Sequence, residues 1–135
     1  MDAGRARSLF EHARVARLAT ADASGAPHLV PVTFAVQGDQ VVLAVDHKPK
    51  TTYDLRRLRN IRANPRVSLL ADHYDEDWAR LWWARADGTA TVHEAGREDA
   101  LSALVAKYDQ YLGRPPQGPV VVVAVSRWSG WAYAG

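Results

Sequence analysis

The sequence predicts a mainly β domain, an antiparallel barrel with about three peripheral helices. Segments rich in β-branched residues follow one another through short turns, which is how antiparallel strands are joined. Helical patterns are few, so the sequence lacks the crossover helices that a doubly wound parallel sheet needs after nearly every strand. The length of 135 residues suits one domain and no linker interrupts it, so we expect a single domain over residues 1–135.

The first part of the chain predicts one helix and then three strands. Apolar residues at helical spacing indicate an amphipathic first helix: Ala6, Leu9, Phe10 and Ala13. Asp2 can cap this helix. Runs of β-forming residues separated by turns predict three strands, over residues 15–22, 29–36 and 41–45. Pro31 places a defect or a free edge in the second of them. We expect the three strands to pair as an antiparallel meander.

A short helix with several arginines is expected next. Thr51 or Thr52 can cap its start, and Asn64-Pro65 ends it, because the residue before a proline disfavours the helical conformation. The apolar stretch that follows predicts a fourth strand over residues 66–72.

The last part of the chain predicts strand, helix and strand. Residues 78–94 form either one long strand or a hairpin broken at Asp87-Gly88. Apolar residues at helical spacing predict a helix over residues 97–112. The final run, residues 119–133, is apolar almost without a break. This favours a strand buried on both faces, in a barrel wall or in a subunit interface.

The basic residues are concentrated in one short segment, from Lys48 to Arg66. Seven of the 17 lysines and arginines lie there: Lys48, Lys50, Arg56, Arg57, Arg59, Arg62 and Arg66. Asp54 is the one acid among them, whereas the rest of the chain carries more acids than bases. A polyanion binder more often spreads its basic residues over a whole face. This concentration suits a discrete anionic ligand, because the segment leaves a strand and enters a helix whose first N–H groups can bind a phosphate.

Two other interpretations of the basic segment stay open. Runs of charge are often simply a solvated helix face. An arginine-rich helix can also bind nucleic acid, with an affinity that falls steeply as salt is added.

Several chemistries are excluded or disfavoured. The chain has no cysteine, so disulfides, thiol catalysis and cysteine-bound metals are excluded. The five histidines form no metal-binding pair, and no serine stands in a nucleophile-elbow motif, so we expect no metal and no catalytic side chain. His47 lies beside the proposed phosphate turn, and a surface role is expected for it. The acidic loop over residues 72–77 lacks a calcium-binding pattern. The charged N-terminal stretch is unlike a signal peptide, so we expect a cytoplasmic protein.

Tryptophan is frequent for a chain of this length. The five residues are Trp78, Trp82, Trp83, Trp128 and Trp131. Neighbours on a strand point to opposite faces, so Trp82 and Trp83 cannot both enter the core. Core or dimer packing is expected for each tryptophan, with stacking of one indole on a ligand ring as the alternative.

The stretch KPKTTYDLRRLRNIRANPRVSLL, taken with the upstream PVTF, resembles the pyridoxamine 5′-phosphate oxidase-like family of split β-barrels. The family pattern is a strand, a basic or hydroxyl-bearing phosphate turn, a short helix, and Asn-Pro or Asp-Pro before an apolar strand. The sequence is most similar to the branch that uses the deazaflavin coenzyme F420, known from actinobacteria. The segments DHYDEDWARLWW and SRWSGWAY are also similar to this branch. The resemblance implies an antiparallel Greek-key split barrel over nearly the whole chain.

The resemblance also implies which residues bind the cofactor. Arg57 stands at the distance before Asn64-Pro65 where the family has a basic residue that contacts the cofactor phosphate. The preceding phosphate loop corresponds to Lys48, Lys50 and Thr51. The strand along the tricyclic ring corresponds to Val30, Pro31, Val32 and Thr33.

The function implied is hydride transfer to or from a small molecule, carried out by F420 in a homodimer whose cofactor site lies between the subunits. The Arg-x-x-Leu-Leu-Lys and Ser-Arg-Lys motifs of the FMN oxidases in the family are missing. F420 is therefore favoured over FMN. The alternatives are an FMN-binding oxidoreductase and a carrier that binds a flavin, a deazaflavin or haem without turnover.

Overall fold

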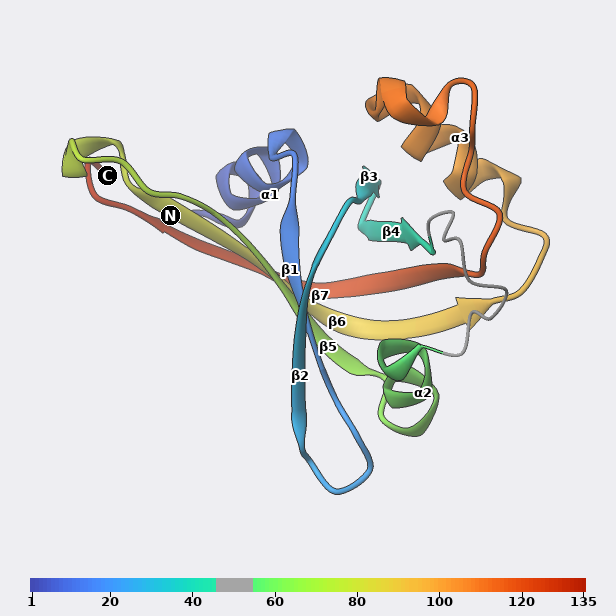
Figure 1. The fold of residues 1–135 in the computed structure, drawn as a ribbon. Helices are drawn as coiled ribbons and strands as arrows, with labels where there is room; N and C mark the ends of the chain where they lie inside the picture. Colours follow the sequence, from blue (N-terminus) through green and yellow to red (C-terminus); the bar gives the residue numbers. More distant parts are fainter. Residues whose placement is uncertain (46–54) are drawn as a thin grey trace.

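Seven strands and three helices make up the part of the chain that the computed structural model describes, residues 1–45 and 55–135. The strands are β1 (Ala16–Ala21), β2 (Pro27–Val32), β3 (Ala35–Gln37), β4 (Gln40–Ala44), β5 (Arg66–His73), β6 (Trp82–His93) and β7 (Val120–Ala132). The helices are α1 (Ala3–His12), α2 (Arg56–Ala63) and α3 (Glu98–Lys107), with short 3₁₀ turns at Trp78–Arg80 and Asp109–Tyr111. The predicted fold class, mainly β with about three helices, is confirmed (Figure 1). None of the helices in these two ranges has the length and apolar character needed to cross a membrane.

The strands form one sheet in the order β2-β1-β5-β6-β7-β4-β3, and the neighbours are antiparallel. The expected pairings of consecutive segments occur, because β1 pairs with β2 and β3 pairs with β4, but the three segments do not form one continuous meander. The predicted strand over residues 29–36 is two strands, β2 and β3, which lie at opposite ends of the sheet order. Thr33 and Phe34 alone connect them, and so short a link spans at most about 11 Å. The two edges of the sheet must therefore lie close together, which curls the sheet into a barrel with an open seam.

The core lies inside this curl. Phe10 of α1 is fully buried, and its ring packs at 4.7 Å from the ring of Phe34 and at 5.4 Å from that of Trp128. Leu58 and Ile61 bring α2 into the same core. As predicted, Asp2 caps α1, since its side chain accepts a hydrogen bond of 2.8 Å from the Arg5 N–H.

The first four residues of β7 are buried on both faces of the sheet. Val121 and Val123 belong to the barrel core, whereas Val120 and Val122 pack under α3. Burial on both faces was expected for the whole C-terminal run, but after Val123 it is incomplete. The helix predicted over residues 97–112 also ends early, at Lys107, with a 3₁₀ turn after it.

A bulge interrupts the pairing of β6 with β7. Asp87 faces Arg127 and Gly88 faces Val125, so Ser126 is an extra residue on β7. Of the two structures expected for residues 78–94, the hairpin broken at Asp87-Gly88 does not form. These two residues lie at a bulge inside one continuous strand, β6. A Cβ atom on Gly88 would lie 2.2 Å from the carbonyl oxygen of Ala124. The extra residue also reverses the alternation of β7, so that Trp128 joins the core.

The sheet has a partly covered outer side and a long extension. Side chains that point away from the core form what we call the outer face, which α3 covers at one end. Beyond α1, the strands β5, β6 and β7 continue together as a long arm, formed by residues 70–85 and 128–133, at the left of Figure 1. Trp82 packs against the core on this arm while Trp83 lies on the outer face, as expected for strand neighbours.

Candidate functional site

A pocket of about 430 Å³ lies at the seam of the barrel and contains the described part of the predicted site. Its walls include Val30, Pro31, Val32 and Thr33 from the end of β2, and Arg57 from α2. Lys48, Lys50, Thr51 and His47 fall outside the described residues. The structure thus brings together two segments that lie 24 or more positions apart in the sequence. We call this the seam pocket.

The remaining walls of the seam pocket are apolar. They come from β1, β4, β7 and the residues next to them: Val15, Leu18, Leu43, Ala44, Val45 and Val121. Sequence reasoning missed these residues, because their apolar runs indicate a strand in the core and not the wall of a pocket. As far as residues 1–45 and 55–135 form it, the seam pocket is therefore an apolar slot with one cationic side chain, a composition suited to a planar ring that carries an anionic group.

The edge of β2 gives the seam pocket a second kind of contact. β2 stands at one end of the sheet order and pairs on one side, with β1. Its other edge carries backbone N–H and C=O groups outside the ladder, and such groups can hydrogen-bond to a ligand. Pro31 removes one N–H donor from this strand, and its place on an edge strand agrees with the prediction.

Packing and one buried polar contact fix the position of α2. Leu58 and Ile61 are buried, and Asn60, which is 4% exposed, donates a hydrogen bond of 3.1 Å from Nδ2 to Oγ1 of Thr20 on β1. Leu55 occupies the N-cap position and offers no side-chain hydrogen bond, so the residue at this position is not the predicted threonine. The helix is therefore held by its C-terminal turns, with Arg57 in the first turn beside the seam pocket.

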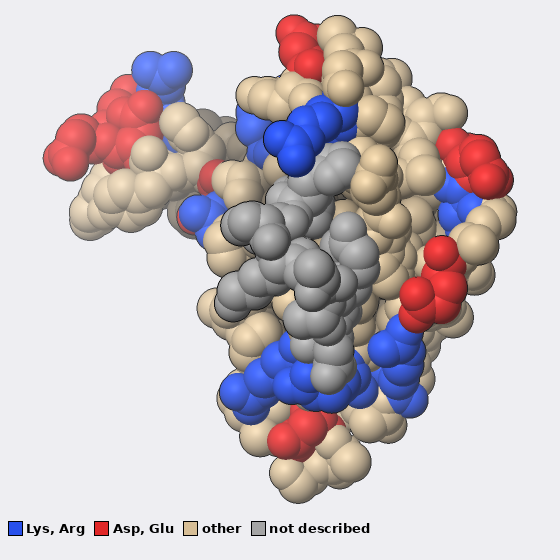
Figure 2. Space-filling view, turned by 45° about the vertical axis from the view of Figure 1, so that its right-hand side comes forward, with Lys and Arg blue, Asp and Glu red and all other residues tan. Residues whose placement is uncertain are grey.

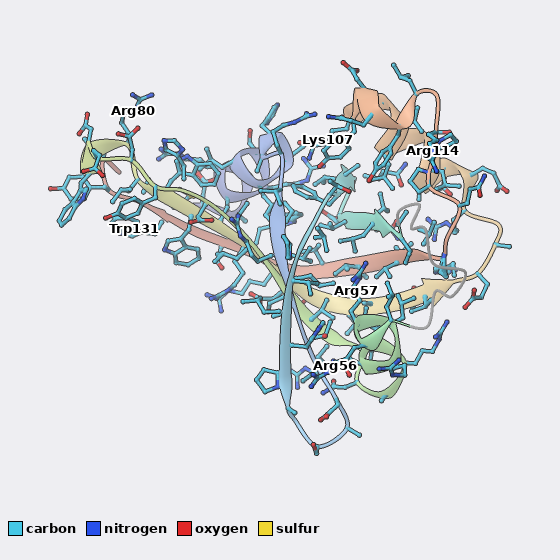
Figure 3. All side chains as sticks on the ribbon, in the orientation of Figure 1. Arg56, Arg57, Arg80, Lys107, Arg114 and Trp131 are labelled. Atoms are coloured by element: carbon cyan, nitrogen blue, oxygen red, sulfur yellow. The ribbon has the colours of Figure 1, made fainter. Side chains whose placement is uncertain are left out.

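Neighbouring arginines of α2 point in different directions. In Figure 3, Arg57 extends from α2 towards β7, whereas Arg56 extends towards the β1–β2 hairpin. Arg62 makes an ion pair with Glu94. Figure 2 shows basic side chains gathered at the lower side of the molecule, where α2 lies in Figure 1. Arg57 is the one arginine of the helix that lines the seam pocket.

Tyrosines from the end of α3 hold the turn where β2 ends. The hydroxyl of Tyr111 is 2.8 Å from Oγ1 of Thr33. The hydroxyl of Tyr108 accepts a hydrogen bond of 3.1 Å from the Phe34 N–H and lies 3.0 Å from the carbonyl oxygens of Phe34 and Arg14. Because Tyr108 is buried, these contacts fix the backbone at the mouth of the seam pocket. The sequence pattern marked both tyrosines only as the apolar face of a helix.

Lys107 at the end of α3 lies over the same turn. Its ammonium nitrogen is 3.6 Å from the centre of the Phe34 ring, is buried, and finds no hydrogen-bond partner in residues 1–45 and 55–135. Burial, and after it the nearby charge of Arg14, lower the pKa of Lys107 to about 8, while the charge of Glu11 acts in the opposite direction. The turn at the pocket mouth is therefore next to a charge that titrates in mildly alkaline solution.

A pH dependence of stability follows from Lys107. Its pKa is about 8 in the folded chain against an ordinary value of 10.5, so the folded chain binds fewer protons between these two pH values. The stability that Lys107 contributes is therefore present in full above pH 10.5, the pKa of an ordinary lysine. It is lost as the pH falls through about 8, the pKa of Lys107 in the folded chain. In urea unfolding, we expect the free energy of unfolding of the wild type to rise relative to that of the Lys107→Met variant as the pH is raised across this window. A difference between the two proteins that is independent of pH would contradict the assignment.

Within the described ranges, no group of three histidine, aspartate or glutamate side chains stands close enough to hold a metal ion. The part of the seam pocket that the structure describes also includes no acid or histidine among its lining residues. Its described residues offer groups for binding and orientation: an arginine, a strand edge and apolar walls.

The family model described as "Pyridoxamine 5′-phosphate oxidase" matches residues 3–132 of this chain. No curated protein sequence matches this chain.

Among solved structures, a conserved hypothetical protein from Mycobacterium tuberculosis has 20% identity and a TM-score of 0.77, with 98% of this chain and 85% of that chain covered. A FAD-binding protein from Mesorhizobium loti has 21% identity and a TM-score of 0.73, with 96% and 94% covered. A haem-binding protein from Mycobacterium smegmatis has 23% identity and a TM-score of 0.78, with 98% and 55% covered. At these identities the likeness is one of fold, and it agrees with the predicted split β-barrel.

Proposed function

Because the chain belongs to the pyridoxamine 5′-phosphate oxidase family, we propose that it is an oxidoreductase that binds coenzyme F420 in the seam pocket and transfers a hydride to or from a small molecule. The observation that carries this proposal is the convergence of Arg57 with residues 30–33 on one apolar pocket. Arg57 would bind the phosphate of the cofactor, and the strand edge of β2 would lie along its ring system.

The residues present fit such a cofactor. An apolar slot accepts the faces of a tricyclic ring, and the free edge of β2 can hydrogen-bond to the polar rim of the ring. A guanidinium group forms strong paired hydrogen bonds with a phosphate. When bound, the deazaflavin supplies the hydride chemistry, so that the protein needs no nucleophile of its own.

The contribution of the protein is then to hold and orient. Val30 and Val32 pack against the core, which keeps β2 rigid along the ring. The tyrosine contacts at Thr33 and Phe34 fix the end of that strand. Apolar walls exclude water from the ring face, which protects a hydride donor or acceptor from solvent.

A flavin or haem ligand is the second candidate. Proteins with this fold include a FAD-binding protein and a haem-binding protein, and the latter need not be an enzyme. An FMN-dependent oxidoreductase or a carrier without turnover would use the same seam pocket. The absence of the FMN-oxidase motifs from the sequence favours F420.

A titration separates these functions. Purified protein is mixed in turn with F420, FMN, FAD and haemin, and tryptophan fluorescence and ligand absorbance are followed. We expect saturable binding of F420 in preference to the others, and reduced F420 to be oxidised by a member of a panel of quinones and enones. Binding of FMN or haemin without binding of F420 would refute the proposal. Binding of F420 with no turnover on the panel would favour a carrier.

We also propose that the protein is a homodimer with the cofactor site at the interface. Apolar residues form a strip on the outer face: Leu29 of β2, Leu70 of β5 and Trp131 of β7 are exposed, and Trp83 of β6, between the last two, is half-buried. Leu29 is 66% exposed and Trp131 is 45% exposed. Large apolar side chains in one strip on an uncovered sheet are typical of an interface with another subunit.

The dimer is tested by sedimentation. The wild type should sediment with twice the mass of one 14.9 kDa chain, and Trp131→Glu should shift it to the mass of one chain, because a charge would be buried in the contact. Leu112→Glu is the control and should keep the dimer, because Leu112 is an exposed apolar residue that follows the 3₁₀ turn after α3, away from the strip. A wild type that sediments as one chain at micromolar concentration would rule the dimer out.

A further inference from the structure

A second recess, of about 630 Å³, lies on the outer face of the sheet. It shares no lining residue with the seam pocket. Its polar lining residues are Thr20, whose hydroxyl oxygen accepts a hydrogen bond from Asn60, and six others: Arg66, Ser68, Asp87, Thr89, Ser126 and Arg127. Neither the family resemblance nor the proposed function gives these residues a role.

The strand register brings the two arginines to either side of the recess. Ser68 of β5 faces Asp87 of β6, which in turn faces Arg127 of β7. In the adjacent row Arg66 faces Thr89. Residues directly opposite in an antiparallel pair have Cβ atoms about 5 Å apart, so both guanidinium groups can reach over the same few residues.

The recess has an excess of positive charge. The carboxylate of Asp87 already has partners within the sheet, since it accepts hydrogen bonds of 2.5 Å from the Ser68 hydroxyl and of 3.1 Å from Nε of Arg85. Arg66 and Arg127 make no ion pair with any residue in the described ranges, although both are exposed. Arg17 on the same face differs, because it pairs with Asp72 at 3.5 Å.

The bulge is what gives Arg127 this place. From Val120 to Ala124 the even-numbered residues of β7 point to the outer face. If β7 kept the same residues but continued without a bulge, alternation would persist, so Trp128 would point outward and Arg127 would point into the core. The bulge instead presents the Ser126 hydroxyl and the Arg127 guanidinium together on the outer face, beside Arg66.

We propose that this recess is a binding site for the phosphate group of a small molecule. Two arginines that pair with no acid among the described residues can each offer paired N–H donors to a phosphate, and the Thr89 hydroxyl adds a further donor. The proposal does not depend on the function proposed for the seam pocket.

The test is a titration of the ¹⁵N-labelled full chain with inorganic phosphate, followed by amide chemical shifts at Ser68, Thr89 and Ser126. We expect saturable shifts at millimolar phosphate. Arg66→Gln and Arg127→Gln should each weaken binding about tenfold, the loss of one charge-assisted contact. Arg17→Gln is the matched control and should leave the affinity unchanged. The Arg57→Glu variant should also bind phosphate in the recess normally, which separates this site from the seam pocket.

Two results would overturn the proposal. One is a set of shifts that grow linearly without saturation, which would mean that the arginines are only solvated. The other is an unchanged phosphate affinity in Arg127→Gln together with a sedimentation mass that falls to one chain. In that case the arginines would face a second copy of the protein.

Discussion

Reversing the charge at Arg57 is expected to weaken binding of a phosphate-bearing cofactor to the seam pocket about a hundredfold. A charge-assisted hydrogen bond contributes about 1–3 kcal/mol, and a carboxylate in place of the guanidinium adds repulsion of the phosphate. Arg57 is the one arginine of α2 that lines the seam pocket, so the remaining arginines cannot replace it there. The dissociation constant of Arg57→Glu, measured by cofactor fluorescence, checks this expectation.

Arg56→Glu is the control for that experiment. It changes net charge by the same amount on the neighbouring residue, which extends towards the β1–β2 hairpin and does not line the seam pocket. We expect its cofactor affinity to stay close to that of the wild type. Equal losses in the two variants would mean that the basic segment attracts the ligand only through its overall charge, and a normal affinity in Arg57→Glu would place the phosphate elsewhere.

Placing a methyl group on Gly88 is expected to destabilise the fold by about 3 kcal/mol, because the paired backbone of β7 must move to accept it. The Cβ atom would lie 2.2 Å from the carbonyl oxygen of Ala124 and 3.0 Å from Cα of Val125. These atoms belong to the ladder between β6 and β7 and cannot rotate away as a side chain would. Urea unfolding of Gly88→Ala, compared with the wild type, measures the effect.

Gly113→Ala is the control for Gly88→Ala, because nothing lies within 4 Å of a Cβ atom at that position. We expect its stability to stay within about 0.5 kcal/mol of the wild type. If Gly88→Ala were as stable as Gly113→Ala, the expectation would be wrong, and the backbone of β7 at the bulge would have to shift at little cost in free energy. The phosphate affinity of the outer recess would then be expected to change too, because Arg127 depends on the same bulge.

The type and rough position of most elements could be predicted from the sequence, because local patterns carry that information. The alternation of apolar residues and the positions of turns predicted the bounds of β1 and β5 to within one residue, and Asp2 predicted the start of α1. The order of the strands could not be predicted. Alternation states which residues face the core, and it says nothing about which strand lies next to which.

The break between β2 and β3 at Thr33-Phe34 shows most clearly what local sequence patterns cannot predict. The local sequence is that of one strand, and the contact that interrupts it comes from Tyr108, 74 positions away. The seam pocket was accessible to prediction only in part, for a similar reason. The basic segment pointed to Arg57 and the resemblance to residues 30–33, but Leu43, Val45 and Val121 became walls only through the closure of the barrel.

The pairing of β4 with β7 has a consequence for how the chain reaches its native state. Gln40 lies opposite Ala124, so the β3–β4 hairpin finds its place in the sheet only after residues 120–124 have been made. During synthesis the seam therefore stays open, with β4 and β6 each lacking a neighbour until nearly the whole chain has left the ribosome. Contacts of such long sequence separation slow folding and expose strand edges to aggregation. We expect nascent chains arrested before residue 120 to remain sensitive to protease, and full-length released chains to become resistant.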